Sequence, residues 1–377
     1  MVPSPEIDIP EGNTVNITRL GGTAAIALVA AIALSSCAAN EAPSASNTAT
    51  TSTLTGTLNG IGSSAQADAE TAWVAGFQTA NPSVTVNYDS QGSGAGRKAF
   101  IGGSADFAGS DAALSATELT STFAGCKAGS GAIDLPVYIS PIGIVYNVAG
   151  VTDLKLDADT IAGIFKGTIT KWNDPAIASQ NSGAKLPDAA ISTVHRSDDS
   201  GTTQNLTDYL ATVAPTVWDK PSGQTFPYSV GDAAKGNQGV VAAVTAAANS
   251  IGYADQSAAG TLAIAQLKVG STYEKITTKG AAAVVAASPL VTGRPANDLA
   301  IAIDRKNSST GAWPIALVSY LIVCQTYADS AKGELVKAYA TYVASSAGQK
   351  AGSDQAKSAP LASDLASKVA DAIATIK

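Results

Sequence analysis

Residues 192–202 read Ser-Thr-Val-His-Arg-Ser-Asp-Asp-Ser-Gly-Thr, and no other stretch of the chain indicates the fold so clearly. Ser192–His195 is predicted to be a strand, and Thr202–Val213 carries apolar residues at helical spacing. The loop between them is small and polar, with one arginine. This strand–loop–helix unit would offer an anion the unpaired N–H groups and the positive dipole end of a helix N-terminus.

Three further segments place small polar residues between a predicted strand and a predicted helix. They are Gly60-Ile61-Gly62-Ser63-Ser64, Gly92-Ser93-Gly94-Ala95-Gly96 and Gly109-Ser110-Asp111. Glycine lets the backbone approach a ligand closely, and serine adds a hydroxyl donor. Taken singly, each segment reads as an ordinary helix cap or turn. Four such segments in one chain favour an anion-binding site.

The first of these segments also has a competing interpretation. Gly60-x-Gly62-x-x-Ala65 follows a predicted strand, and Asp89 lies about two dozen residues later, as in a dinucleotide-binding fingerprint. Alanine in the third position argues against that interpretation. The hydroxyls of Ser63 and Ser64 have no role in it either.

Strand and helix patterns alternate from residue 55 onward, which predicts an α/β protein. The apolar run Leu135–Asn147 is interrupted by Pro141 and Gly143, and it is predicted to form two strands joined at a bend, crossing between domains. We expect Leu262–Lys268 to cross back. Trp313–Tyr327 is predicted to be an apolar helix or a strand–helix unit.

Length and composition exclude several classes of protein. The chain has 377 residues, which favours two domains, and 45% hydrophobic residues against 14% charged ones exclude general disorder. The net charge of −7 argues against a nucleic-acid partner. The single histidine, His195, excludes multi-histidine metal sites, and we expect no metal and no cofactor.

The N-terminal region is typical of an export signal. The apolar run 23–34 is shorter than the ~20 residues of a membrane span and fits the core of a signal peptide. It leads into Leu34-Ser35-Ser36-Cys37, which resembles a bacterial lipobox. We therefore predict a signal peptide over 1–36, lipidation of Cys37 and a flexible tether over 37–54. The alternative is a buried N-terminal helix.

Two cysteines follow the predicted cleavage site. Outside the cytoplasm, Cys126 and Cys324 can pair in a disulfide. The alternative is a pair of buried free thiols.

In these segments the chain resembles the phosphate-binding proteins of bacterial phosphate ABC transporters, over roughly residues 55–350. The resemblance also rests on Ile164-Phe165-Lys166-Gly167 leading to Lys171-Trp172-Asn173-Asp174, and on Lys235-Gly236-Asn237-Gln238-Gly239 followed by Ser250-Ile251-Gly252-Tyr253. It implies an α/β fold of the type II periplasmic-binding-protein class, with two lobes and a ligand cleft between them. Lobe 1 would comprise 55–145 plus 256–377, and lobe 2 would comprise 146–255.

The resemblance also implies a role for each matching residue. Asp111 would accept the proton of hydrogen phosphate, and Arg196, held by Asp198, would donate to phosphate oxygens. The remaining donors would be hydroxyls and backbone N–H groups of Ser64, Ala65, Ser93, Ser200, Gly201 and Thr202. The family often has Thr-Phe where this chain has Ser64-Ala65, so an aromatic lid is missing here.

Local alternatives stand beside these roles. The alternative for Asp111 is a simple helix cap, and the alternative for Arg196 is a surface ion pair with Asp198 or Asp199. His195 is interpreted as a structural neighbour of the site and Trp172 as a packing residue.

The implied function is an extracytoplasmic lipoprotein that captures inorganic phosphate and delivers it to permease subunits, without catalysis. Only its lipid anchor would touch the cell membrane. The alternative is a secreted phosphate-ester hydrolase of similar architecture, but the sequence has no histidine cluster and no Gly-x-Ser-x-Gly motif. A third class, an adhesive or structural lipoprotein, does not account for the four anion-type loops.

Overall fold

The computed structural model describes residues 53–377. The predicted signal peptide, Cys37 and nearly all of the tether lie outside the described residues. None of the helices that residues 53–377 form has the length and apolar character that a membrane span requires.

A nine-stranded sheet runs through this part of the chain, in the order β2-β1-β3-β12-β4-β8-β6-β7, with β9 paired to β4. Its strands are β1 (Gly56–Gly62), β2 (Val84–Asp89), β3 (Phe107–Ser110), β4 (Ala132–Asn147), β6 (Ser192–Arg196), β7 (Asp232–Ala234), β8 (Ser250–Asp255), β9 (Ala263–Ile264) and β12 (Ala316–Cys324). A second, three-stranded sheet has the order β11 (Thr272–Glu274), β10 (Gln266–Val269) and β5 (Lys155–Leu156). Parallel and antiparallel pairs occur together, so the fold is mixed α/β.

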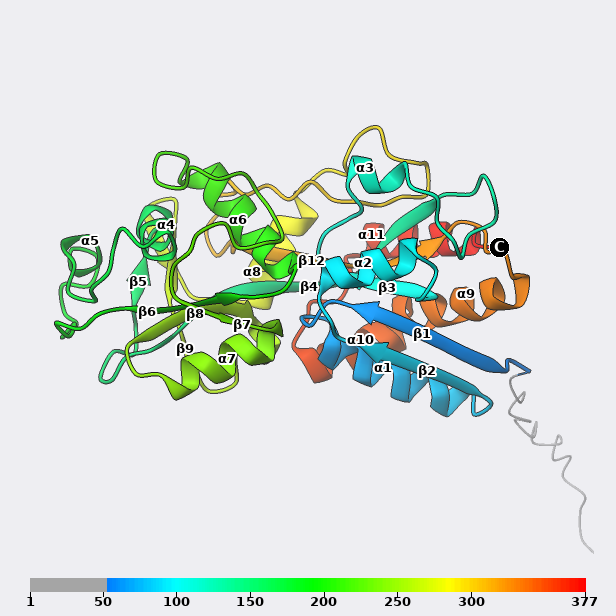
Figure 1. Ribbon diagram of the computed structural model, residues 1–377, viewed down its shortest axis with the longest axis horizontal. Coiled ribbons are helices and arrows are strands. Elements are labelled where there is room, and N and C mark those ends of the chain that lie inside the picture. The colour runs from blue at the N-terminus through cyan, green and yellow to red at the C-terminus, as the bar shows by residue number, and fades with distance from the viewer. Residues whose placement is uncertain (1–52) are drawn as a thin grey trace, which may run out of the picture. The chain divides into compact units, whose positions relative to one another are not determined.

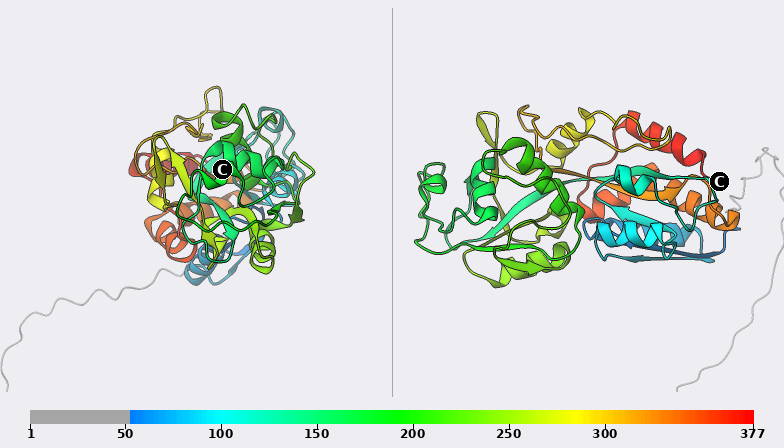
Figure 2. Two further views of the ribbon diagram at one scale, coloured as in Figure 1. Left: turned by 90° about the vertical axis from the view of Figure 1, so that its left-hand side faces the viewer. Right: turned by 45° about the horizontal axis from the view of Figure 1, so that its top comes forward.

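Figure 1 shows the elements gathered into two groups. One group holds β1, β2 and β3 with α1 (Ala67–Ala80), α2 (Ser93–Ile101), α3 (Ala116–Leu119), α9 (Ser330–Ala344), α10 (Ser346–Ala356) and α11 (Ser363–Ala374). The other holds β5 to β9 with α4 (Ala158–Lys166), α5 (Pro175–Ala178), α6 (Gly201–Val213) and α7 (Gly236–Ala246). The second view in Figure 2 shows the same two groups side by side.

Strand β4 connects the two groups. Its first part, Ala132–Pro141, pairs with β12, and its last part, Ile142–Asn147, pairs with β8. The prediction of two strands joined at a bend was therefore wrong. The strand changes its partner after Pro141 but remains one 16-residue strand.

Trp313–Tyr327 forms neither a helix nor a strand–helix unit. Its centre is β12, which lies between β3 and β4, and all nine of its residues are buried. A strand covered on both faces has no alternation of polar and apolar residues, so periodicity does not separate it from a buried helix.

The segment Leu262–Lys268 stays beside β4 and β5. Ala263–Ile264 pairs with Tyr146 and Val145 of β4, and Gln266 and Leu267 pair with β5. These strand pairs connect residues that precede the predicted lobe boundary, between residues 255 and 256, with residues that follow it. The position of that boundary stays a prediction.

Helix α1 has an apolar face that is turned into the core. Trp73 and Phe77, four residues apart, are both buried on one face. The indole N–H of Trp73 donates to the carbonyl of Gly348 at 2.8 Å, and the rings of Phe77 and Tyr339 meet edge to face at 5.2 Å. The helix is thus anchored against α9 and α10, which fixes the position of its N-terminus.

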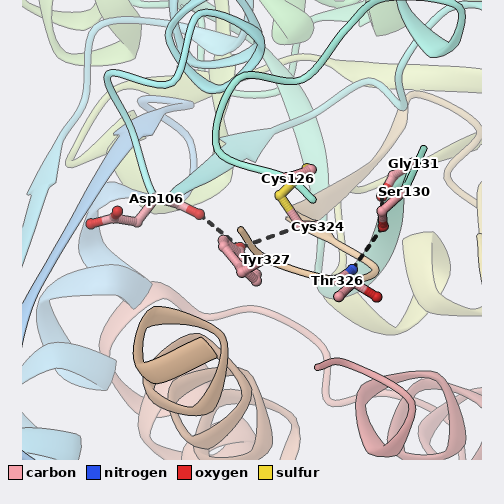
Figure 3. The surroundings of a disulfide bond; sticks show 7 residues. All are labelled: Asp106, Cys126, Ser130, Gly131, Cys324, Thr326 and Tyr327. Atoms are coloured by element: carbon pink, nitrogen blue, oxygen red, sulfur yellow. Dashed lines mark hydrogen bonds between the residues drawn. A yellow bond between two sulfur atoms is a disulfide. The ribbon is translucent and has the colours of Figure 1, made fainter. Parts of the chain in front are cut away.

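Cys126 and Cys324 are joined by a disulfide, with Cα atoms 5.3 Å apart (Figure 3). It ties the end of β12 to the loop that precedes β4. Beside it, the Tyr327 hydroxyl accepts from the Cys324 N–H at 3.3 Å and donates to the carbonyl of Asp106 at 2.8 Å. Both sulfurs are buried in the group that contains β3.

Candidate anion-binding site

Four helix N-termini meet where the two groups of elements face each other. The N–H of Gly94 in α2 donates to the carbonyl of Asp199 before α6 at 2.9 Å. The N–H of Asn237 in α7 donates to Ser64, just before α1, at 3.0 Å. Each N-terminus brings N–H groups without intrahelical partners and a positive dipole end. Three of the segments predicted from the sequence precede α1, α2 and α6. The fourth, Gly109-Ser110-Asp111, does not begin a helix, but it adjoins the others because the N–H of Asp111 donates to the hydroxyl of Ser93 at 3.1 Å.

Glycine is required at the closest approach of the two sides. A Cβ atom on Gly201 would lie 2.6 Å from the Cβ of Asp111 and 2.6 Å from the Oγ of Ser93. Gly92 has a φ of 107°, and a Cβ there would meet a carboxylate oxygen of Asp198 at 2.4 Å. Any larger residue would hold the two sides apart.

Asp111 follows β3 and is buried, with 3% of its surface exposed. Its Oδ1 accepts from the hydroxyl of Ser319 at 2.8 Å, and its Oδ2 accepts from the hydroxyl of Thr202 at 3.2 Å. Burial raises the pKa of Asp111, although the hydroxyls of Ser63, Ser319 and Thr202 and the charge of Arg196 favour the ionised form. The structure thus gives Asp111 more than a capping role, because both oxygens serve as acceptors inside the cleft.

Arg196, at the end of β6, is buried and has a partly buried carboxylate partner, Asp198. Its Nε donates to Oδ1 of Asp198 at 2.7 Å, its Nη2 donates to Oδ2, and its Nη1 reaches the Thr202 hydroxyl at 3.3 Å. Burial on its own would raise the pKa of Asp198, but the hydrogen bonds and charge of Arg196 outweigh it and lower that pKa. The guanidinium is 1% exposed, so this is not a surface ion pair.

Ser200, Gly201 and Thr202 begin α6. The Ser200 hydroxyl accepts from the N–H of Thr203 at 3.0 Å, so it caps the helix. Thr202 has its side chain fully buried and linked to both Arg196 and Asp111. The hydroxyl of Thr202 therefore bridges the guanidinium of Arg196 and the carboxylate of Asp111 by hydrogen bonds.

The remaining predicted donors lie on the β1 and α2 side. Ser64 Oγ accepts from the side-chain amide of Asn237 at 3.0 Å, and Ser93 Oγ accepts from the N–H of Asp111 at 3.1 Å. The N–H of Ala65 donates to the hydroxyl of Ser63 at 3.0 Å. All the predicted residues are thus brought together, and their roles toward a ligand stay predictions.

Two polar residues of this site have no role predicted from the sequence: Asn237, which lies within a stretch quoted only for the family resemblance, and Ser319. Asn237 follows Gly236 at the start of α7, after the short strand β7. That is the same strand–glycine–helix pattern as in the other segments, so the signal was present. Ser319 is a single serine within the buried strand β12, 208 residues from the Asp111 that it contacts. Nothing local marks it.

The neighbouring residues have structural partners. The ring of His195 stacks on Phe226 with centroids 4.1 Å apart. The indole N–H of Trp172 donates to the carbonyl of Asn249 at 2.9 Å in a buried position. Within residues 53–377 no cluster of three or more His, Cys, Asp or Glu side chains is arranged to hold a metal ion.

The arrangement suits a small protonated oxyanion. The Arg196–Asp198 pair has no net charge, and Asp111 adds a negative one, so attraction must come largely from hydrogen bonds and helix dipoles. A carboxylate beside the ligand favours an anion that carries a proton.

Comparison with known proteins agrees with this chemistry. The sequence profile of the PBP superfamily domain matches residues 47–347. The chain is 39% identical over 289 residues to the phosphate-binding protein PstS 3 of Mycobacterium leprae, covering 75% of this chain and 77% of that one. It is 37% identical over 325 residues to the phosphate-binding protein PstS 2 of Mycobacterium tuberculosis, covering 85% and 87%.

Solved structures show the same two-lobed fold. The phosphate-bound periplasmic phosphate-binding protein PfluDING has a TM-score of 0.68 at 24% identity, over 83% of this chain and 93% of that one. A phosphate-binding protein from Stenotrophomonas maltophilia has a TM-score of 0.67 at 24% identity, over 84% and 93%.

Proposed function

Since the chain belongs to the PBP superfamily, and within it to the PstS phosphate-binding proteins, we propose that it captures inorganic phosphate between its lobes. It acts outside the cytoplasm as the solute-binding protein of a phosphate ABC transporter. The observation that carries this proposal is the chain Arg196–Thr202–Asp111, which links one neutralised cation to one buried acceptor. Hydrogen phosphate has oxygens for the first and a proton for the second.

Calorimetry with phosphate, arsenate and sulfate tests the proposal. Phosphate and arsenate should bind alike, because both carry at least one proton near neutral pH. Sulfate should bind at least ~100-fold more weakly, about 2.7 kcal/mol, since it has no proton for Asp111. Equal binding of phosphate and sulfate would contradict the proposal.

We expect no phosphate-ester hydrolysis. The relatives are named as phosphate-binding proteins, and the comparisons give no support to the hydrolase alternative. Ser200, which precedes the first residue of α6, caps that helix and has no histidine bonded to it. A phosphate-ester turnover assay run beside the binding assay separates the two functions.

We further propose that lipid on Cys37 anchors the protein, through the predicted tether 37–54, to the outer face of the cell membrane. Two acyl chains on this cysteine would give stable membrane anchoring, whereas a single acyl chain gives only marginal binding. Cys37→Ser should abolish labelling with fatty acid and release the protein from membranes. Continued membrane association of that variant would refute the anchor and leave phosphate binding untouched.

The permease subunits of the transporter are the proposed partners. Lobe closure around phosphate would create the surface that they recognise. Phosphate should therefore increase the affinity of this protein for its permease in a co-reconstituted membrane, and sulfate at the same concentration should not.

A further inference from the structure

Asn237 lies at the point where both sides of the cleft meet. It is fully buried near the start of α7. Its main-chain N–H and its side-chain Nδ2 both donate to the hydroxyl of Ser64, each at 3.0 Å. Nδ2 also reaches the hydroxyl of Thr202 at 3.3 Å. One side chain thus holds a hydroxyl from each side.

The amide of Asn237 has only one orientation that satisfies its neighbours. Its Oδ1 accepts from the main-chain N–H of Asp255, at the end of β8, at 2.9 Å. An amide oxygen is an acceptor and an amide nitrogen is a donor. The bond from Asp255 therefore turns Nδ2 toward Ser64 and Thr202.

This arrangement determines where the Ser64 proton points. A hydroxyl has two acceptor lone pairs and one proton to donate. Both lone pairs of Ser64 are used by Asn237, and residues 53–377 offer no acceptor for its proton in this structure. The Ser64 hydroxyl is left as a donor to whatever occupies the cleft.

The same reasoning applies to Thr202. Its hydroxyl accepts from Nη1 of Arg196 and from Nδ2 of Asn237, and it donates to Oδ2 of Asp111. Because both lone pairs are filled by donors, the Thr202 proton is directed at the carboxylate. Asp111 is thereby kept as an acceptor.

We propose that Asn237 is a positioning residue that orients the hydroxyls of Ser64 and Thr202 for phosphate. This inference rests on the proposed function and goes beyond the direct contacts expected for the ligand. Without the Asn237 side chain, Ser64 keeps only the main-chain N–H of residue 237 as a donor, and its hydroxyl can turn the released lone pair toward the anion, which is a repulsive arrangement in a buried site.

A double-mutant cycle measured by phosphate calorimetry tests the proposal. Asn237→Ala should weaken phosphate binding ~20-fold in the wild-type background, the size of losing one hydrogen bond to a charged group. In the Ser64→Ala background the same change should cost less than ~5-fold, because the hydroxyl it orients is gone. Equal losses in the two backgrounds would overturn the proposal.

Asn237→Asp gives a second readout that does not depend on deleting the side chain. The new carboxylate has nearly the same shape but accepts where the amide donated, so phosphate affinity near neutral pH should fall ~100-fold or more. The deficit relative to wild type should shrink as the pH is lowered, because a protonated carboxyl can donate again. A deficit that does not change with pH would count against orientation of the hydroxyls.

Asn181→Ala is the matched control. Asn181 is also buried, and its side chain exchanges hydrogen bonds with the main chain of Lys155 at 2.8 Å and donates to Ile177 at 2.9 Å, without contact to any predicted site residue. It should lower the unfolding temperature and leave phosphate affinity unchanged. If the wild type bound no phosphate, the proposed function would fail; if the wild type bound and the cycle were additive, only this inference would fail.

Discussion

On the β6 and α6 side of the cleft, the buried guanidinium of Arg196 is neutralised by Asp198. On the β3 and α2 side, the buried carboxylate of Asp111 accepts from serine and threonine hydroxyls, those of Ser319 and Thr202 among them, and has no cation bonded to it in the described residues. Both sides hold helix N-termini. The difference separates two tasks: the first side attracts any oxyanion, and the second selects one that brings a proton.

The two sides also differ in covalent cross-linking. The disulfide lies in the group of elements that carries Asp111 and closes a loop of 198 residues, whereas the Arg196 side has none among the residues described. If selection depends on the groups that face the ligand and not on the disulfide, removing the disulfide should lower stability without changing phosphate affinity.

The largest expected effect is on stability. Changing Cys126 and Cys324 together to serine should lower the free energy of unfolding by about 4–5 kcal/mol, because the unfolded chain gains the entropy of an open loop. Urea denaturation measures the loss, and phosphate affinity should stay within ~3-fold of wild type. A large fall in phosphate affinity would mean that the Asp111 side needs the disulfide to keep its binding geometry. Mass spectrometry of the unreduced protein checks that the bond is present.

The next effect is on attraction. Arg196→Ala removes the cation and leaves the partly buried Asp198 without its partner, so phosphate affinity should fall ~1,000-fold, about 4 kcal/mol. Sulfate affinity should fall by a similar factor, and the ratio of the two should barely move. Arg294→Ala is the control, since Arg294 is also paired with buried carboxylates, Asp134 and Asp298, but has no bond to the cleft residues. A changed ratio of phosphate to sulfate affinity in Arg196→Ala would mean that Arg196 contributes to selection as well as to attraction.

A smaller effect is expected on selection. Asp111→Asn should narrow the phosphate-to-sulfate ratio from at least ~100-fold toward ~10-fold, because an amide can donate to sulfate where a carboxylate repels it. Titrating both anions into both proteins gives the ratio directly. Asp134→Asn, a change at a buried carboxylate that has no hydrogen bond to Asp111, Arg196 or Thr202, should leave the ratio as it is. An unchanged ratio in Asp111→Asn would remove Asp111 from selection.

The Arg196 side of the site was predicted from the sequence more completely than the Asp111 side. Residues 196–202 lie in one strand–loop–helix unit, so their proximity follows from local structure alone. The Asp111 side is completed by Ser319, which comes from a strand far along the chain. That strand was itself misassigned, since burial on both faces removed its periodicity.

The smallest effect tests whether charges at the rim of the cleft belong to either task. Lys98 of α2 and Asp199 before α6 form an ion pair at 2.7 Å across the cleft, but Lys98 is 74% exposed and Asp199 is 37% exposed. Water and salt screen such a pair, which is worth at most about 1 kcal/mol.

Lys98→Ala should therefore weaken phosphate binding less than ~5-fold, and the difference should disappear in high salt. Lys350→Ala is the matched control, because the Lys350–Asp354 pair has the same distance of 2.7 Å and Lys350 is equally exposed, but the pair lies within α10. It should have no effect on binding at any salt concentration. Both variants should keep the wild-type ratio of phosphate to sulfate, because the rim pair contacts neither Arg196 nor Asp111. A loss of ~100-fold in Lys98→Ala would place part of the attraction on the α2 side and would erase the division between the two sides of the cleft.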